Sequence, residues 1–332
     1  MKKRILIAGA GGFIGGHLAK SLLDEGHEVV CADSKPFEYW FQNFEECENY
    51  SLDLKEYENC LKTSKGIDYI YNMACNMGGM GFIENNKAEC MLSVLINANL
   101  LRASIKNSVT RYFFSSSACV YNGSKQKNTF IEGLKESDAY PAMPEDGYGW
   151  EKLFSERMCR HFYEDYGLET RVARYHNVYG PIGTFDGGRE KAPAALCRKL
   201  IQAKNSGDKK IDVWGDGEQT RSFMFIDDCI KGTKRIFESD CREVLNIGSE
   251  EQVSINQMIS IIEEIGKYKV EKNYQLDKPK GVRGRSSNND LVREKLGWDS
   301  DVSLKSGLEI TYKWIEKEIS KKLNDNKFAI KY

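Results

Sequence analysis

The 332-residue chain is predicted to be an α/β protein, with a Rossmann-type doubly wound parallel sheet and a smaller C-terminal α/β substrate lobe. Short apolar runs typical of buried parallel strands recur through the first half, and the first run leads directly into a glycine-rich turn. The length also exceeds one average domain. We therefore expect a dinucleotide-binding domain over residues 1–175, with a return segment at about 222–248, and the second lobe over 176–221 and 249–332.

Composition places the chain among soluble globular proteins. Hydrophobic residues make up 41% and charged residues 29%, and the net charge of −1 gives no reason to expect a nucleic-acid or membrane partner. Ten cysteines stand at scattered spacings, without a C-x-x-C pair or zinc-ligand spacing, so we expect reduced thiols, no metal and a cytoplasmic location. The first apolar run is too short for a signal peptide, and no run approaches the length of a membrane span.

A strand is expected at residues 4–8, and the turn after it has the composition of a phosphate-binding site. Such a turn, between a strand and a helix, brings the backbone and a helix N-terminus close to a pyrophosphate. The glycines stand three residues apart, unlike the two-plus-one fingerprint of other dinucleotide-binding proteins. The predicted cofactor contacts in this turn are Gly9, Gly12, Phe13, Ile14 and Gly15.

The second strand, at residues 27–32, ends at Asp33. A carboxylate at this point accepts both ribose hydroxyls and repels a 2′-phosphate, which favours NAD over NADP. Lys35, two residues later, slightly weakens that inference. Asp53 follows a third strand-like run and is open to two interpretations: a cofactor contact, or the cap of a helix that starts at Lys55.

The fourth strand, at residues 67–74, leads into a glycine-rich segment at 76–82. Doubly wound sheets bind ligands at this edge, where glycines let the backbone approach them, although a flexible loop is the alternative. A helix over about 83–106 should follow, and its apolar face indicates either core or a dimer contact. That face consists of Met91, Val94, Leu95, Ala98 and Leu101.

The fifth strand ends at Ser117, and a later helix, from about 146 to 166, carries Tyr148 and Lys152 on one face. An ammonium beside a phenol should lower the pKa of Tyr148, so that the tyrosine can exchange a proton with a hydroxyl. Cys119 would share a face with Ser117 if the chain stays extended. Its thiol is either a small buried hydrophobe or a thiolate favoured by nearby positive charge.

Basic residues stand beside turns in the second half. Lys191 precedes a helix expected from residue 192, and the positive end of the helix dipole should lower the pKa of its amine. Arg221 suits a diphosphate or a sugar oxygen, and Arg283 and Arg285, on one loop, have the character of a diphosphate clamp.

An amphipathic closing helix is expected over about 304–323. The last residues, through Tyr332, are expected to be loosely held.

The ordered set of glycine turn, strand-end serine and Tyr-x-x-x-Lys resembles the extended short-chain dehydrogenase/reductase family. The resemblance implies that Ser117, Tyr148 and Lys152 form a hydride-transfer site with NAD. It also implies that Asp53 and Leu54 flank the adenine, that Ala74 contacts the cofactor, and that Asn177 begins the turn towards the substrate lobe. A homodimer through a helical bundle is expected by the same analogy.

Three further segments resemble the members of that family that epimerise GDP-linked sugars: residues 77–82, 116–119 and 187–195. The resemblance implies transient oxidation of GDP-mannose at C4, proton exchange at C3 and C5 by Cys119 and Lys191, and re-reduction to GDP-L-galactose, with GDP-L-gulose as a possible C5-only product. A C4 dehydrogenase or epimerase of a related GDP-sugar, such as a GDP-heptose, is the alternative. The implied substrate contacts are Met77, Gly78, Gly79, Met80, Ser117, Cys119, Asn177, Lys191, Arg221, Arg283 and Arg285.

Overall fold

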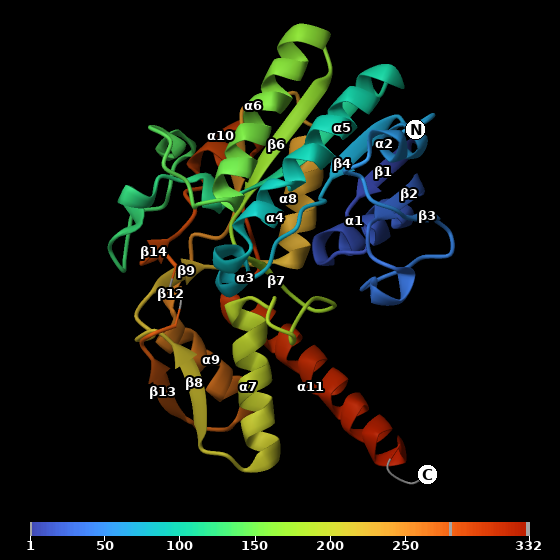
Figure 1. Cartoon of the computed structure of the whole chain (residues 1–332). Coiled ribbons are helices and arrows are strands. Elements are labelled where there is room, and N and C mark those ends of the chain that lie inside the picture. Colours follow the sequence, from blue (N-terminus) through green and yellow to red (C-terminus); the bar gives the residue numbers. More distant parts are fainter. Residues whose placement is uncertain (1, 279–280, 330–332) are drawn as a thin grey trace.

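The computed structural model describes residues 2–278 and 281–329, which form two lobes, one above the other in Figure 1. The larger lobe is built on a seven-stranded, fully parallel sheet with the order β11-β6-β5-β4-β1-β2-β3. The predicted doubly wound sheet is therefore confirmed. Its strands are β1 (Arg4–Ala8), β2 (Glu28–Asp33), β3 (Glu48–Ser51), β4 (Tyr69–Asn72), β5 (Arg111–Ser117), β6 (Glu169–Tyr175) and β11 (Leu245–Ile247).

Helices cover both faces of this sheet because successive side chains of each strand point to opposite sides. Ile5 and Ile7 of β1 join the apolar cluster that includes one pair of helices, whereas Leu6 and Ala8 join the cluster of the other face. The first pair is α1 (Phe13–Asp24) and α8 (Ile226–Glu238), and the other face carries α2 (Tyr57–Thr63), α5 (Ser93–Lys106) and α6 (Tyr148–Tyr166).

The prediction of a single helix over residues 83–106 is wrong. The structure divides it into α3 (Met80–Asn85), α4 (Lys87–Met91) and α5. Asn86 interrupts the first two, with φ −133° and ψ 45°, and its side-chain amide donates to the carbonyl of Phe82 at 2.9 Å. This side-chain bond to the preceding turn competes with helix continuation, as asparagine commonly does.

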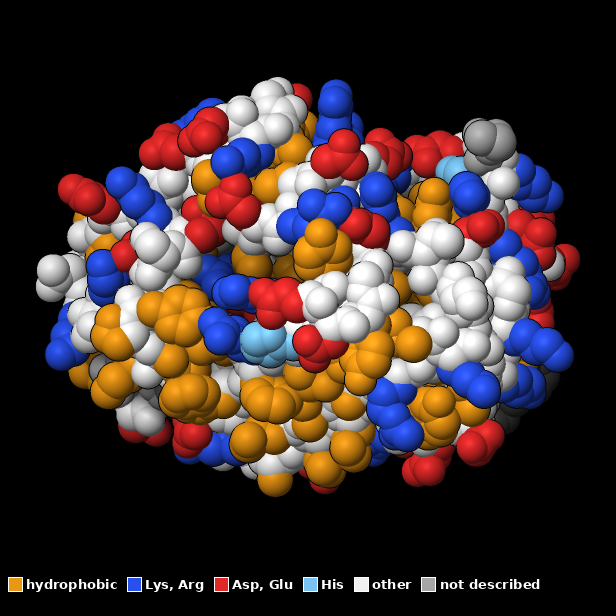
Figure 2. Space-filling model, turned by 90° about the horizontal axis from the view of Figure 1, so that it is seen from above, with side chains coloured by type: hydrophobic (Ala, Val, Ile, Leu, Met, Phe, Trp, Pro, Cys, Tyr) orange, Lys and Arg blue, Asp and Glu red, His pale blue; other side chains and the backbone are white. Residues whose placement is uncertain are grey.

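Within the described residues, the stretch Lys87–Lys106 is long and apolar enough to cross a membrane by length and composition. The fold gives another reason for that composition: Leu100 and Leu101 are fully buried against the sheet. The predicted apolar face is divided, since Leu101 lies in the core while Met91 and Leu95 are exposed. Hydrophobic side chains gather along the lower edge of Figure 2, on the side of the molecule where α5 and α6 lie.

The smaller lobe combines short sheets with long helices. β8 (Lys210–Trp214) pairs in parallel with β13 (Glu271–Gln275), and β9 (Thr220–Ser222) lies between β12 (Gln252–Ser254) and β14 (Gly284–Arg285). Its helices are α7 (Ala192–Ser206), α9 (Ile255–Gly266) and α11 (Leu304–Ala329). The remaining elements are β7 (Val178–Tyr179), β10 (Met224–Phe225), α10 (Asp290–Leu296) and four 3-10 turns at Phe37–Tyr39, Ala118–Val120, Gly123–Gln126 and Glu136–Ala139.

The two lobes share one apolar core. Leu200 of α7, Ile259 of α9 and Ile315 of α11 belong to the same cluster as Ile5 of β1. α11 runs six residues beyond the predicted end at residue 323. The prediction about the last residues concerns positions up to Tyr332, and 330–332 lie outside the described part of the chain.

Candidate active site

A cavity of about 650 Å³ opens at the carboxyl edge of the large sheet, where the strand order reverses between β1 and β4. Residues of both lobes line it. The predicted site residues in its wall are Gly9, Gly12, Phe13, Ile14, Gly15, Asp33, Asp53, Leu54, Ala74, Met77, Gly78, Ser117, Tyr148 and Lys191. The predicted residues outside this wall are Gly79, Met80, Cys119, Lys152, Asn177, Arg221, Arg283 and Arg285.

The glycine turn has the geometry of a phosphate cradle. Gly9 has φ +84°, a region that favours glycine, and a Cβ on Gly15 would lie 2.2 Å from the Gly9 carbonyl oxygen. Gly12 caps α1 without a side-chain hydrogen bond, so the first N–H groups of the helix have no side-chain partner there. The turn therefore fits a pyrophosphate group.

The end of β2 presents the carboxylate expected for a ribose. Asp33 accepts a hydrogen bond from the Lys35 backbone N–H at 3.0 Å. The Lys35 ammonium donates to the Gly11 carbonyl at 2.6 Å, and burial lowers its pKa. The Lys35 ammonium is thus hydrogen-bonded to the glycine turn, and Asp33 is the group suited to bind the ribose hydroxyls.

Asp53 does not cap a helix. Its carboxylate accepts from the Lys55 N–H at 2.9 Å within a turn, and α2 begins only at Tyr57, with Glu56 as its N-cap. The cap interpretation is therefore wrong. Asp53 and Leu54 both line the cavity.

Ser117 and Tyr148 meet because two glycines let α6 begin directly over β5. Gly147 has φ +73° and packs against the backbone of Lys87, and a Cβ on Gly149 would lie 2.3 Å from the Cys119 carbonyl oxygen. The Ser117 hydroxyl is close enough to the Tyr148 phenol to lower its pKa slightly against the larger effect of burial, and both residues line the cavity. The two hydroxyls can therefore act on one substrate group.

The predicted fall in the Tyr148 pKa is wrong. Burial raises the pKa of Tyr148 well above its ordinary value, with Cys75, Cys119 and Glu151 adding to the rise. The Lys152 ammonium is buried, 5.6 Å from the centre of the Tyr148 ring and 3.8 Å from the Glu151 carboxylate. The largest effect on this phenol is the loss of phenolate hydration on burial, and the lysine charge does not reverse it.

Cys119 lies in a short 3-10 turn, Ala118–Val120, so the chain does not stay extended after Ser117. Its N–H donates to the Ser117 hydroxyl oxygen at 3.2 Å, which keeps the two residues together. Burial and the neighbouring Glu145 raise the pKa of the thiol to about 12, although Arg285 opposes them. Of the two interpretations of this thiol, the small buried group is therefore supported and the thiolate is not.

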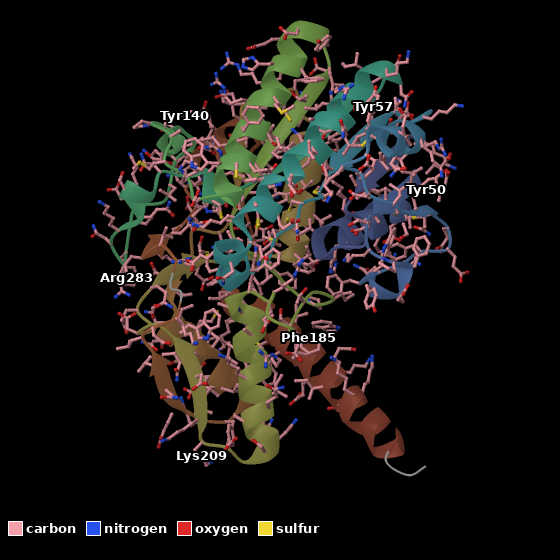
Figure 3. The ribbon with its side chains drawn as sticks, viewed as in Figure 1. Tyr50, Tyr57, Tyr140, Phe185, Lys209 and Arg283 are labelled. Carbon is pink, nitrogen blue, oxygen red and sulfur yellow. The ribbon has the colours of Figure 1, made fainter. Side chains whose placement is uncertain are left out.

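The two arginines of the 281–286 loop do not form one clamp. Arg285 is buried and donates to the Cys119 sulfur at 3.5 Å and to Glu145 at 3.2 Å. Arg283 instead pairs with Asp216 at 2.8 Å, at the edge of the molecule in Figure 3. Arg221 lies close enough to Arg285 that burial and this second charge lower its pKa to about 10.

Lys191 is the N-cap of α7 and lines the cavity. Its pKa is lowered, the direction predicted, but the main cause is burial, with repulsion from Arg285 in the same direction. Cys119 interacts electrostatically with Lys191. An amine and a thiol therefore face the same region.

The glycine-rich segment at residues 76–82 contacts the glycine-rich loop at residues 187–190. The Gly79 N–H donates to the Arg189 carbonyl at 3.1 Å, and a Cβ on Gly79 would lie 2.8 Å from the Glu190 carbonyl oxygen. The Arg189 guanidinium stacks 3.9 Å from the centre of the Phe82 ring and donates to Asn76 at 3.3 Å. Gly79 is thus needed for contact between the two loops. The sequence had indicated a different role for it, the approach of the backbone to a ligand.

Met80 and Asn177 have packing roles in this structure. Met80 lies against Gly281 beside Arg221. The Asn177 side chain donates to the Ser222 carbonyl at 3.1 Å and so ties β7 to the end of β9.

Sequence reasoning missed Glu145, Gln126 and Cys75. Glu145 and Gln126 both bind Arg285, and Cys75 lies within hydrogen-bonding distance of the Lys152 ammonium. A carboxylate three residues before the site tyrosine was a visible signal for Glu145. No sequence spacing relates Gln126 to Arg285, since 159 residues separate them.

Comparisons with known proteins agree with this geometry. The sequence profile of the NAD dependent epimerase/dehydratase family matches residues 5–248. The chain belongs to this family. A relative from Arabidopsis thaliana, named GDP-mannose 3,5-epimerase, is 48% identical over 319 residues, which cover 96% of this chain and 83% of the relative.

Solved structures of the family share the whole fold. A UDP-glucose 4-epimerase from Thermotoga maritima, described with UDP-glucose, has a TM-score of 0.85 and 26% identity, and the match covers 95% of this chain and 99% of that one. A UDP-glucuronic acid 4-epimerase from Bacillus cereus, in complex with UDP-glucuronic acid and NAD, has a TM-score of 0.80 and 26% identity, again over 95% and 99%. The matches to these solved structures therefore span both lobes of this chain.

Proposed function

We propose that the protein epimerises GDP-mannose at C3 and C5, forming GDP-L-galactose, with GDP-L-gulose as the C5-only product. The observation that carries the proposal is that Lys191 lines the cavity with Ser117 and Tyr148, while Cys119 is hydrogen-bonded to Ser117 and close enough to Lys191 to interact with it electrostatically. Inversion at carbon requires a base on one face of the sugar and an acid on the other. The 48% identity to a named GDP-mannose 3,5-epimerase over nearly the whole chain supports the same substrate.

We propose NAD as the tightly held cofactor. The glycine turn fits its pyrophosphate, Asp33 suits the ribose hydroxyls, and Asp53 and Leu54 line the cavity where the adenine would lie. Bound NAD would supply reversible hydride acceptance at C4, and the 4-keto sugar has acidic protons at C3 and C5. Lys152, buried beneath the cavity, would hold the nicotinamide ribose and the Tyr148 phenol in position.

Each side chain then has a separate task. Ser117 and Tyr148 would exchange the proton of the C4 hydroxyl, while Lys191 and Cys119 would exchange protons with carbon. Arg221 and Arg285 would stabilise the anionic diphosphate or the enolate oxygen, because the buried Arg285 donates to Cys119 and the half-buried Arg221 lies close to Arg285. Met77 and the two glycines after it would enclose the sugar.

The test is proton NMR of GDP-mannose with the purified protein in D2O, without added cofactor. The proposal predicts loss of the H3 and H5 signals and new L-sugar signals, with no net NADH. Cys119→Ala and Lys191→Ala should each abolish the inverted product. Accumulation of a 4-keto sugar would indicate a dehydrogenase instead, and turnover of GDP-heptose alone would assign a different sugar.

We also propose that the protein forms a homodimer through α4, α5 and α6. Met91 of α4 and Leu95 of α5 are exposed, as is Leu92 between these helices, and Trp150 and Phe154 are exposed on α6. Apolar side chains gather on this side of the molecule in Figure 2. The same face of a second copy of the chain would cover this apolar surface with a matching one.

A further inference from the structure

Outside the residues assigned above, one buried carboxylate lies next to a reacting atom. Glu145 is only 14% exposed at its side chain, and its backbone N–H donates to the Cys119 carbonyl at 2.9 Å. Its carboxylate is close enough to the Cys119 thiol for each group to shift the pKa of the other. The Oε2 atom is buried and has no hydrogen-bond partner of normal geometry among the described residues.

Arg285 joins the acid and the thiol from the other side. One terminal nitrogen donates to the Cys119 sulfur at 3.5 Å, the other donates to Glu145 Oε1 at 3.2 Å, and Nε donates to Gln126 at 2.7 Å. The fork is rigid and planar, so these three contacts fix the carboxylate relative to the sulfur.

We propose that Glu145 is a positioning residue for Cys119: it accepts the thiol hydrogen bond and keeps the proton on sulfur until carbon receives it. Cys119 then acts as the acid of the first inversion and Lys191 as the base. This inference rests on the proposed function for the sugar chemistry, but its core, the link between Glu145 and the thiol, does not require a substrate.

The proton balance of one inversion follows from this assignment. The neutral Lys191 amine takes the proton from the carbon next to the C4 ketone, and the electron pair moves into the enolate. The S–H bond of Cys119 then breaks, its proton forms the new C–H bond on the opposite face, and the thiolate remains beside Arg285. Solvent protons restore the thiol and remove the proton from Lys191.

The charge environment of the thiol supports this direction. Burial and Glu145 raise the Cys119 pKa, whereas burial lowers that of Lys191. An acid that holds its proton and an amine that releases one are suited to these two tasks. The titratable and charged groups that face Cys119 are Glu145, Arg285, Arg221, Lys191 and Tyr148.

The first experiment titrates the Cys119 thiolate by its ultraviolet absorbance, as the difference between each protein and the same protein with Cys119→Ala. Glu145→Gln removes the charge and keeps an amide that can bind Arg285. We expect its thiolate to appear at least about one pH unit lower than in the wild type, because a nearby charge shifts a pKa by about 1–3 units. Glu145→Asp should stay near the wild type.

Glu132→Gln, the same change at an exposed position on a nearby loop, is the matched control and should titrate like the wild type. Circular dichroism checks that each variant is folded. Equal titrations of wild type and Glu145→Gln, or a thiolate already present at neutral pH in the wild type, would overturn the proposal.

A second experiment tests the direction of transfer with GDP-mannose in D2O. Cys119→Ala should still wash deuterium into C3 or C5 without inversion, since Lys191 can remove and return a proton on one face. Lys191→Ala should show no wash-in. The reverse pattern would overturn the assignment of acid and base, and turnover of no GDP-sugar by the wild type would refute the proposed function while leaving the thiol titration interpretable.

Discussion

Burial shifts the pKa values of Cys119 and Lys191 in opposite directions because one group is an acid and the other a cationic base. Removing water disfavours the charged form of each, so the pKa of the thiol rises and that of the amine falls. Burial raises the pKa of the Tyr148 phenol in the same way as that of the thiol. At the residue scale, the surroundings therefore decide which groups carry protons before a substrate arrives.

Lys191 should give the pH profile of the enzyme its ascending limb. Its amine must be neutral to accept a proton, so kcat/KM should rise as pH rises through the lowered lysine pKa. Lys191→Arg keeps the charge but does not deprotonate, and it should reduce turnover about 10²–10⁴-fold. A profile of kcat/KM against pH by NMR would check this, and an unchanged limb in Lys191→Arg would contradict it.

His176 should make folding sensitive to acid. Burial, together with Arg285 and Arg174, lowers its pKa from 6.5 to about 3. Between these values the unfolded chain binds the additional proton, so the free energy of unfolding falls as pH falls below about 6.5. The loss from about pH 7 to about pH 5 should be about 2 kcal/mol.

Urea unfolding at the two pH values measures this loss. His176→Gln removes the titrating group and should reduce the pH dependence, whereas His161→Gln, at an exposed position, should retain it. Equal pH dependence in wild type and His176→Gln would refute the assignment.

At the scale of elements, one buried ion pair connects α6 to the sheet. Glu156 of α6 binds Arg174 of β6 at 2.8 Å and also accepts from the Ser116 hydroxyl of β5. Glu156→Gln leaves the buried guanidinium without its counter-charge, which should cost about 3–5 kcal/mol of stability. Glu164→Gln, on the exposed side of the same helix, should leave the thermal midpoint nearly unchanged.

Differential scanning calorimetry of the two variants provides the measurement. Similar midpoints for Glu156→Gln and Glu164→Gln would show that the buried pair does not anchor α6.

The contact between the two glycine-rich loops should control catalysis. Gly79→Ala places a methyl group 2.8 Å from the Glu190 carbonyl oxygen, so the two loops must separate. A shift of this size at a positioned site can cost about 100-fold in rate. Gly81→Ala is the matched control, because its Cβ meets only the Trp214 ring at 3.4 Å. Steady-state rates and unfolding curves of both variants test this, and similar rates would argue against a loop role.

At the scale of the whole molecule, the apolar face of α4, α5 and α6 predicts a dimer in solution. Light scattering should give twice the mass of the 37.9 kDa chain. Leu95→Glu should reduce it to the monomer mass by placing a charge in the apolar contact. Ile310→Glu, also at an exposed apolar position but on α11, should not. A monomer mass for the wild type would rule out the proposed dimer.

The sequence alone determined the doubly wound sheet, the glycine turn and part of the cavity wall. Local signals carry these features: apolar strands, turn glycines and residues at strand ends use physics that acts over a few positions. The family and the pairing of Tyr148 with Lys152 on one helix could be predicted for the same reason. A cytoplasmic location stays a prediction.

Only the tertiary structure decided the protonation states and the partners of the arginines. The pKa of Tyr148 depends on burial by segments far along the chain, and Arg285 reaches Cys119 across 166 positions. Desolvation and long-range contacts are properties of the packed chain, so no local pattern of residues specifies them.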